Sequence, residues 1–253
     1  MEIPAMPRDL REHWAQGLCA HGGWVQMPGV RPLEMMARGG FDYLTIDMQH
    51  GLVDRSDLVP MMAVATRIGI PTMVRVPRNE PSHIGFALDN GAAGIIIPMV
   101  ETADEAAAAV RAALYAPAGT RSFGPARGPR DPARANMKTI VVPMIETRRA
   151  LDHLDEILET PGVDAVYVGP ADLSISLGLP PALFQEGEFE SAINRIADRC
   201  AHHGVIAGIH ASADLAARHR LGGYRLITVA SDAVLLSEGA AAAMEAAAGE
   251  PGV

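Results

Sequence analysis

Short apolar segments recur along this chain, and the intervals between them leave room for one helix each. They are rich in Val, Ile, Leu and Ala, as the buried strands of a parallel sheet are. We expect strands at Ala20–Gln26, Tyr43–Asp47, Thr72–Arg75, Gly94–Pro98, Ile140–Ile145, Ala165–Val168, Val205–Ile209 and Arg225–Val229. Eight strands that alternate with helices predict a closed (β/α)8 barrel. A doubly wound open sheet is the alternative.

Length and composition agree with one barrel domain that spans residues 1–253. A (β/α)8 TIM barrel has about 250 residues, and this chain has 253. Apolar residues make up 49% of the chain, which is ample for a large core, whereas aromatic residues make up only 4%. Aliphatic side chains must therefore fill the barrel. No low-complexity linker interrupts the strand and helix rhythm.

Helix-capping signals lie between the expected strands. Asp54 or Ser56 is suited to cap the helix after the second strand. Thr102 and Glu105 have the spacing of a capping box. Thr147 is suited to cap the helix after the fifth strand. These signals place helices where the barrel requires them.

Two segments depart from this rhythm. Residues 121–138 are rich in Gly, Pro and Arg and lack a clear period, so we expect a long functional loop there. Residues 233–248 form an Ala-rich helix whose apolar content exceeds what one core contact needs. We expect this C-terminal helix to pack on another subunit, and exchange of the helix between subunits is one such arrangement.

The net charge of −9 argues against a nucleic-acid partner or an anionic membrane surface, because both require a basic face. Cys19 and Cys200 are too few for a disulfide framework, which favours a reducing compartment. Met1-Glu2-Ile3-Pro4 does not resemble a signal peptide, and no apolar run reaches membrane-spanning length. We therefore expect a cytoplasmic protein that acts on small molecules.

Polar side chains close several of the expected strands. Asp47 ends the second strand and His50 follows it; Arg75 ends the third. Glu146 follows the fifth strand and Asp172 the sixth. Because the active site of a (β/α)8 barrel forms where its strands end, these residues are candidates for one site. Taken singly, each has an ordinary explanation as a helix cap, an ion pair or a loop residue.

Their chemistry is coherent as a set. Glu146 and Asp172 offer hard oxygen ligands for Mg²⁺ or Mn²⁺. A cation there, aided by the permanently charged Arg75, would stabilise the enolate of a 2-oxo acid. A histidine side chain has a reference pKa of about 6.5, so His50 is a candidate to move a proton near neutrality. The backbone amides at Gly169 to Asp172, apart from Pro170, could hold the substrate carboxylate.

Five segments of the chain carry a family resemblance. They are Phe41–His50, Val74–Pro77, Gly91–Val100, Met144–Thr147 and Gly169–Ser174. Together, and in this order, they resemble the HpcH/HpaI family of metal-dependent class II pyruvate aldolases, typified by 4-hydroxy-2-oxoheptanedioate aldolase. The match extends over roughly residues 22–232. The resemblance implies a carbon-carbon lyase that cleaves a 4-hydroxy-2-oxo acid to pyruvate or hydroxypyruvate and an aldehyde.

The resemblance also assigns roles to residues of the active site. The metal ligands of the family fall on Glu146 and Asp172, with Mg²⁺ or Mn²⁺ expected and Co²⁺ or Zn²⁺ as alternatives. The enolate-stabilising arginine falls on Arg75. The catalytic histidine falls on His50, with Asp47 in the same loop.

Further positions follow from the same resemblance. The acid that pairs with the catalytic histidine falls on Asp89 and could come from another part of the assembly. Trp24 and Ser122 match residues that line the substrate pocket of the family. Gly169 and Ala171, whose backbone amides could hold the substrate carboxylate, are the other expected substrate-binding residues. The family implies a hexamer, a trimer of dimers, with exchanged C-terminal helices.

Two departures from the family pattern concern specificity. Met144 stands where some relatives have Gln, which would remove a polar contact near the metal, and the connector at residues 124–139 is shorter than usual. Two other functions remain open from the sequence. One is a lyase for CoA thioesters of the citryl or malyl kind, and the other is a non-catalytic metal-binding barrel.

Overall fold

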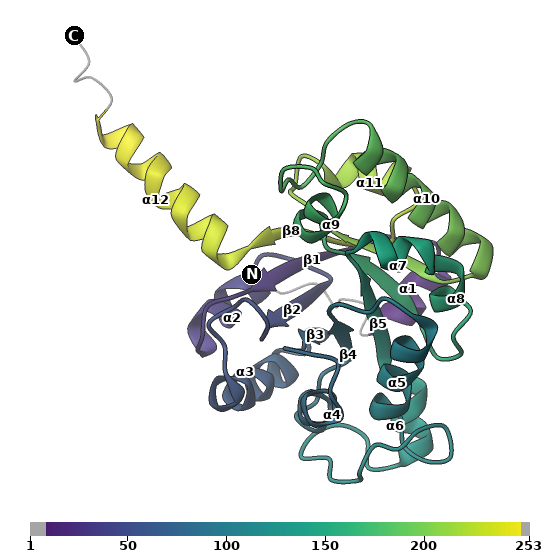
Figure 1. The fold of residues 1–253 in the computed structure, drawn as a ribbon. Helices are drawn as coiled ribbons and strands as arrows, with labels where there is room; N and C mark the ends of the chain where they lie inside the picture. The colour runs from purple at the N-terminus through teal and green to yellow at the C-terminus, as the bar shows by residue number, and fades with distance from the viewer. Residues whose placement is uncertain (1–8, 249–253) are drawn as a thin grey trace.

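The computed structural model describes residues 9–248 and contains one closed barrel of parallel strands (Figure 1). The strands are β1 (Ala20–Val25), β2 (Tyr43–Asp47), β3 (Thr72–Arg75), β4 (Gly94–Ile97), β5 (Ile140–Ile145), β6 (Ala165–Val168), β7 (Ile206–His210) and β8 (Leu226–Ser231). Each strand pairs with the next, and β8 pairs with β1. The barrel prediction is confirmed and the open sheet is excluded. The predicted single domain also included residues 1–8 and 249–253, which lie outside the described residues.

Helices connect the strands and cover the outside of the barrel. They are α1 (Leu10–Ala15), α2 (Val30–Ala37), α3 (Arg55–Ile68), α4 (Pro81–Asp89), α5 (Ala103–Ala113), α6 (Pro132–Lys138), α7 (Arg148–Asp152), α8 (Leu154–Leu158), α9 (Pro170–Ser176), α10 (Glu188–His203), α11 (Ala216–Leu221) and α12 (Asp232–Ala248). The predicted caps are confirmed. Asp54 caps α3, Thr102 and Glu105 form the capping box of α5, and Thr147 caps α7.

Strands β1, β4, β7 and β8 have bounds that differ by one or two residues from the predictions, and two differences affect the connector and the site. The connector at 121–138 was expected to be a loop, but its last part forms α6, where the side chain of Asp131 accepts hydrogen bonds from the first turn. Strand β7 begins and ends one residue later than predicted, at Ile206 and His210. The second difference matters for the site, because it places a histidine at the end of a strand.

Side chains of each strand alternate between two cores. Leu44 and Ile46 of β2 face the surrounding helices, whereas Tyr43 points into the barrel. The barrel interior is filled by Leu10, Ala20, Trp24, Tyr43, Met73, Ile96, Ile140, Val142, Met144, Ala165, Tyr167 and Leu226. Within this interior the hydroxyl of Tyr167 donates a hydrogen bond to Thr228 Oγ1 at 2.6 Å. The interior is therefore a packed core and not a channel.

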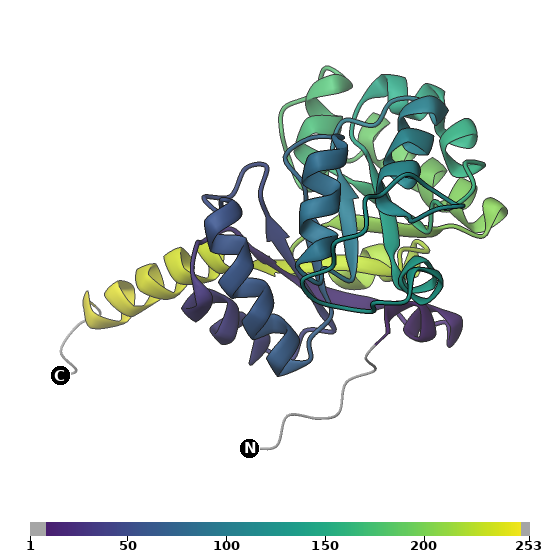
Figure 2. The ribbon, with the colours of Figure 1, turned by 90° about the horizontal axis from the view of Figure 1, so that it is seen from below.

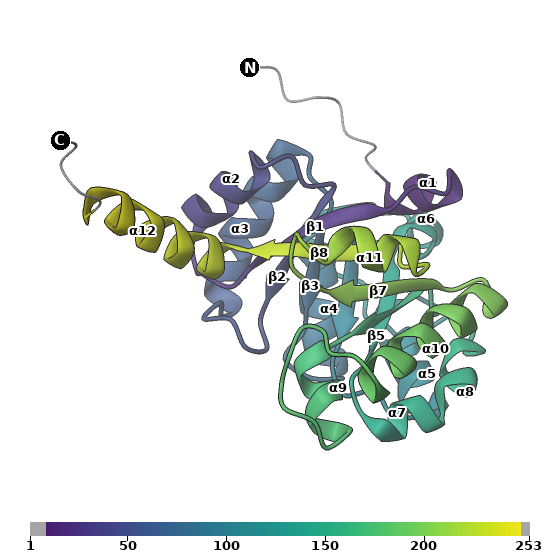
Figure 3. The same ribbon diagram turned by 90° about the horizontal axis from the view of Figure 1, so that it is seen from above.

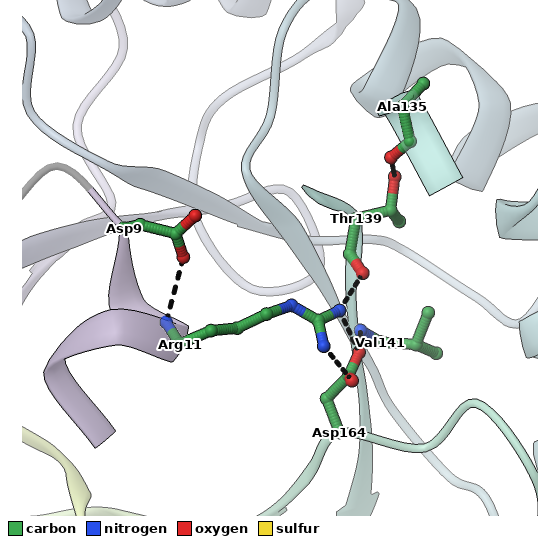
Figure 4. A network of polar contacts seen from close by, with 6 residues as sticks. All are labelled: Asp9, Arg11, Ala135, Thr139, Val141 and Asp164. Atoms are coloured by element: carbon green, nitrogen blue, oxygen red, sulfur yellow. Dashed lines mark hydrogen bonds and ion pairs between the residues drawn. The ribbon is translucent and has the colours of Figure 1, made fainter. Parts of the chain in front are cut away.

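Helix α1 closes the end of the barrel at which the strands begin. Arg11 donates to both carboxylate oxygens of Asp164, at 2.6 and 2.9 Å, and to the carbonyl of Thr139 at 2.5 Å (Figure 4). Asp164 in turn accepts from the backbone N–H of Val141 at 2.9 Å. These contacts attach α1 to the starts of β5 and β6. The candidate residues Asp47, Arg75 and Glu146 lie at the opposite end, where the strands finish.

Helix α12 leaves the barrel instead of packing back against it, as all three ribbon views show (Figures 1, 2 and 3). Of its residues only Asp232 is buried. The carboxylate of Asp232 accepts hydrogen bonds from the backbone N–H groups of Gln26 at 2.9 Å and Met27 at 3.0 Å. The root of α12 is thus tied to the loop after β1.

None of the helices within residues 9–248 combines the length and the apolar character needed to cross a membrane.

Candidate active site

A buried ion pair lies at the ends of β2 and β3. Asp47 and Arg75 are register partners on these neighbouring strands, and both are buried. Arg75 Nε donates to Asp47 Oδ1 at 2.8 Å, and Arg75 Nη2 donates to Asp47 Oδ2 at 2.5 Å. This bidentate contact fixes the plane of the guanidinium. An arginine has five N–H groups, so three remain to donate to a ligand at the barrel mouth.

Trp24 completes the support of this pair. Its indole N–H donates to Asp47 Oδ2 at 3.2 Å, and the Arg75 guanidinium lies 5.0 Å from its ring centroid. Burial would raise the pKa of Asp47, but the hydrogen bonds and charge of Arg75, together with those donated by Gln49 and Trp24, hold it below its ordinary value. Asp47 is therefore ionised and holds Arg75 in place beside the ring of Trp24.

Glu146 is the most perturbed acid at the barrel mouth. Its side chain lies one residue beyond β5 and is 2% exposed. Burial raises its pKa to about 7, and the negative charge of Asp172 adds to the effect, whereas a hydrogen bond from Met99 and the charge of Arg75 oppose it. A buried carboxylate without a full counter-charge is suited to receive a cation.

Asp172 supplies the second carboxylate. It lies in the first turn of α9 and is exposed, as is Ala171, whereas Gly169 is buried. Within the described residues no group of three or more His, Cys, Asp and Glu side chains could hold a metal ion. If Glu146 and Asp172 hold a cation, most coordination positions of an octahedral ion are left to substrate and water. This donor set fits Mg²⁺ or Mn²⁺.

Gly169 allows this arrangement because it has no side chain. A Cβ at residue 169 would lie 2.6 Å from Glu146 Oε2 and 3.0 Å from the terminal methyl of Met144. Met144 itself is 2% exposed and belongs to the apolar barrel interior. It therefore contributes packing beneath Glu146 and no polar contact.

His50 lies on the exposed loop after β2, and this loop is anchored through Asp47. Backbone N–H groups of Gln49 and His50 donate to Asp47 Oδ1 at 3.0 and 3.3 Å. Leu52 N–H donates to the carbonyl of Gln26 at 2.9 Å. The imidazole of His50 forms no hydrogen bond within the part of the chain that the structure describes, so it remains available to a ligand.

His210 was missed by the sequence analysis, which ended the seventh strand at Ile209. The imidazole of His210 packs edge-on against Trp24, with ring centroids 5.1 Å apart. Burial lowers its pKa to about 4, and the nearby charge of Arg75 contributes, against the opposing charge of Asp47. His210 is therefore a neutral histidine at the barrel mouth. In the sequence, the signal that could have identified His210 is its position directly after an apolar run.

Asp89 and Ser122 lie apart from these residues within one chain. Asp89 ends α4, on the side where β4 begins, and its carboxylate accepts from Arg121 Nη2 at 2.6 Å. Ser122 is exposed and lines a groove on α4 together with Asp89 and Arg121. The single chain therefore does not bring Asp89 to His50.

The fold agrees with comparisons to known proteins. Residues 24–238 match the model of the family described as HpcH/HpaI aldolase/citrate lyase. A hydroxypyruvate/pyruvate aldolase of Rhizorhabdus wittichii is 40% identical over 91% of this chain and 95% of its own. A 4-hydroxy-2-oxo-heptane-1,7-dioate aldolase of Escherichia coli is 36% identical over 92% of this chain and 94% of its own.

A solved structure supports the same assignment. The crystal structure of an HpcH/HpaI aldolase/citrate lyase family protein from Burkholderia cenocepacia superposes with a TM-score of 0.84 at 34% identity, covering 91% of this chain and 95% of that one. The family match spans far more than half of the chain, and the relatives align over nearly their whole length. This chain belongs to the HpcH/HpaI aldolase/citrate lyase family.

Proposed function

We propose that this protein is a class II aldolase that reversibly cleaves 4-hydroxy-2-oxo acids to pyruvate or hydroxypyruvate and an aldehyde. The proposal is supported by two features that lie together at the mouth of the barrel. One is Arg75, fixed by Asp47 with N–H groups to spare. The other is the acid pair Glu146 and Asp172, in which Glu146 has its pKa raised to about 7.

Residues of this chain take part in each proton and charge movement of the proposed cleavage. His50 accepts the proton of the C4 hydroxyl, the C3–C4 bond breaks, and its electrons move through C3 to the oxygen at C2. Arg75 donates hydrogen bonds to that oxygen as negative charge develops on it. Return of a proton to C3 releases the 2-oxo acid. Backbone N–H groups at Ala171 and Asp172, in the first turn of α9, would orient the substrate carboxylate.

A divalent cation held by Glu146 and Asp172 would supply Lewis-acid stabilisation of the same developing charge. Mg²⁺ and Mn²⁺ suit two carboxylates and an otherwise open coordination sphere, with Co²⁺ and Zn²⁺ as alternatives. Metal dependence is therefore part of the proposal, and it rests on the burial of Glu146 and the charge of Asp172 beside it.

We also propose that the active protein is an oligomer, a hexamer of the trimer-of-dimers kind, in the cytoplasm. The apolar side chains of Val234, Leu235 and Leu236 on α12 are 47 to 61% exposed, which supports packing on another subunit. In such an assembly Asp89 of one subunit would pair with His50 of another. Trp24 and Ser122 would then line the substrate pocket.

The names of the relatives favour an aldolase over the two rival functions. The similar proteins named above are aldolases for hydroxypyruvate, pyruvate or a 4-hydroxy-2-oxo acid. A lyase for CoA thioesters would need a nucleotide-binding surface, and a non-catalytic barrel would not catalyse the exchange of pyruvate protons.

Proton exchange tests the proposal without knowledge of the aldehyde. Pyruvate in D₂O with Mn²⁺ or Mg²⁺ should lose its methyl proton signal in the presence of the protein. EDTA, Glu146→Gln and Asp172→Asn should each abolish this exchange, because they remove the charge stabilisation at the C2 oxygen. Exchange that persists in EDTA would overturn metal dependence, and its absence with every metal would overturn the aldolase assignment.

A further inference from the structure

The turn after β4 contains a backbone conformation that its own side chain does not explain. Met99 has φ 56°, and no other residue apart from glycine within 9–248 has a positive φ. This left-handed conformation costs a residue with a side chain on the order of 1 kcal/mol. The Met99 side chain is 53% exposed, so its packing cannot be what holds the backbone there.

The conformation directs the Met99 amide at Glu146. Strands β4 and β5 are neighbours in the barrel, with Ile97 opposite Pro143. Met99 lies two residues beyond β4, and its backbone N–H donates to Glu146 Oε1 at 2.7 Å. A hydrogen bond from an amide to a buried carboxylate is of the stronger, charge-assisted kind.

Glu146 is confined on its other side as well. Gly169 passes so close that any Cβ there would collide with Oε2. One oxygen of the carboxylate is thus bound by an amide, while the other lies against the backbone at the start of α9, the helix that carries Asp172. The rotation of the carboxylate is set by Met99 on one side and Gly169 on the other.

We propose that Met99 is a positioning residue whose left-handed backbone orients Glu146, so that Oε2 faces the cation position shared with Asp172. This inference rests on the metal role given to Glu146 in the proposed function. The amide acts through Glu146 and does not touch the substrate. The side chain of Met99 is not needed, but a residue that tolerates positive φ is.

Substitutions at residue 99 distinguish the effect of the backbone conformation from the effect of the side chain. Met99→Gly keeps the N–H and adopts positive φ without strain, so Mn²⁺ affinity should stay within about twofold of the original. Met99→Ile keeps the N–H but is β-branched, which disfavours positive φ; Mn²⁺ affinity should fall about tenfold. Met137→Ile is the matched control, because Met137 is 68% exposed on α6.

Calorimetric titration of Mn²⁺ into the metal-free full-length protein gives these affinities directly. Thermal unfolding without metal checks that each variant is folded. If Met99→Ile is folded and binds Mn²⁺ as the original does, positioning by Met99 is overturned. If instead Glu146→Gln binds Mn²⁺ normally, the proposed metal role of Glu146 is what fails.

Hydrogen exchange gives a second test that needs no metal and no change at residue 99. The Met99 amide should be protected in the original protein, and Glu146→Ala should speed its exchange at least tenfold, because the acceptor is lost. Mass spectrometry of a peptide that spans residues 94–101 measures this. Equal exchange in the two proteins would show that the amide is not held by Glu146 and would overturn the inference.

Discussion

The carboxylate of Asp47 determines how the guanidinium of Arg75 is oriented. Two N–H groups of Arg75 are occupied by Asp47, and the bond from Trp24 keeps the carboxylate in place. A lysine at position 75 would keep the charge but would lose the planar fork that makes the bidentate contact. The substitution would therefore change the orientation of the donors while it keeps their charge.

Arg75→Lys should lower the rate of metal-dependent pyruvate proton exchange about 100-fold, because an oriented donor to the developing oxyanion is lost. The rate is measured by proton NMR in D₂O. Arg78→Lys is a suitable control, since Arg78 is exposed in the loop after β3. An unchanged rate in Arg75→Lys would exclude a directed role for the guanidinium.

His210 should make stability depend on pH between about 6.5 and 4. Its pKa is about 4 in the folded protein, below the ordinary 6.5. As the pH falls through this range the unfolded chain binds a proton that the folded protein does not, so the free energy of unfolding falls, by roughly 3 kcal/mol in total. His210→Asn should lose less stability than the original between pH 6.5 and 4.5 in urea denaturation.

The exposed His202 provides the matched control for this measurement. His202→Asn should leave the pH dependence of stability as it is in the original protein. Parallel stability curves for His210→Asn and the original would show that His210 does not remain neutral in the fold.

At the level of secondary-structure elements, the first residue of α12 is hydrogen-bonded to the loop after β1. Asp232 accepts hydrogen bonds from the N–H groups of Gln26 and Met27, and the carbonyl of Gln26 accepts from Leu52 in the loop that carries His50. A change at the start of α12 should therefore reach the loop that carries His50 through backbone hydrogen bonds.

Asp232→Ala should lower the free energy of unfolding by about 2 kcal/mol, because two partly buried N–H groups lose a charged acceptor. It should also speed hydrogen exchange in peptides that cover residues 26–27 and 50–52. Asp232→Asn retains one acceptor oxygen and should show a smaller loss. Faster exchange at residues 26–27 alone would show that the two loops are not coupled.

Sequence patterns predicted most of these elements because their causes are local. The N-caps at Asp54, Thr102 and Thr147 depend on side chains within three residues of the helix start. Helix α6 was missed because Pro132–Lys138 is too short to show a period. The end of β7 was misplaced because hydrogen bonds to β8, and not the apolar run, extend the strand to His210.

For the whole molecule, the projecting helix α12 predicts self-association. Leu236 is 61% exposed in the isolated chain. Leu236→Asp should lower the mass measured by light scattering, because burying an unpaired charge in an apolar interface is costly. Leu221→Asp is the matched control, since Leu221 is 80% exposed on α11, and should leave the mass unchanged. Equal masses for all three proteins would exclude Leu236 from an interface.

The sequence by itself determined the eight β/α units, the helix caps and the polar residues that close the strands, since each depends on neighbours within one or two turns. The tertiary structure alone decided which of those residues meet. Closure of the barrel joined Asp47 to Arg75, placed His210 beside Trp24 and left Asp89 with Arg121. It also raised the pKa of Glu146 and set Met99 against it. Burial and charge act through space between strands, and no local pattern in a chain encodes those distances.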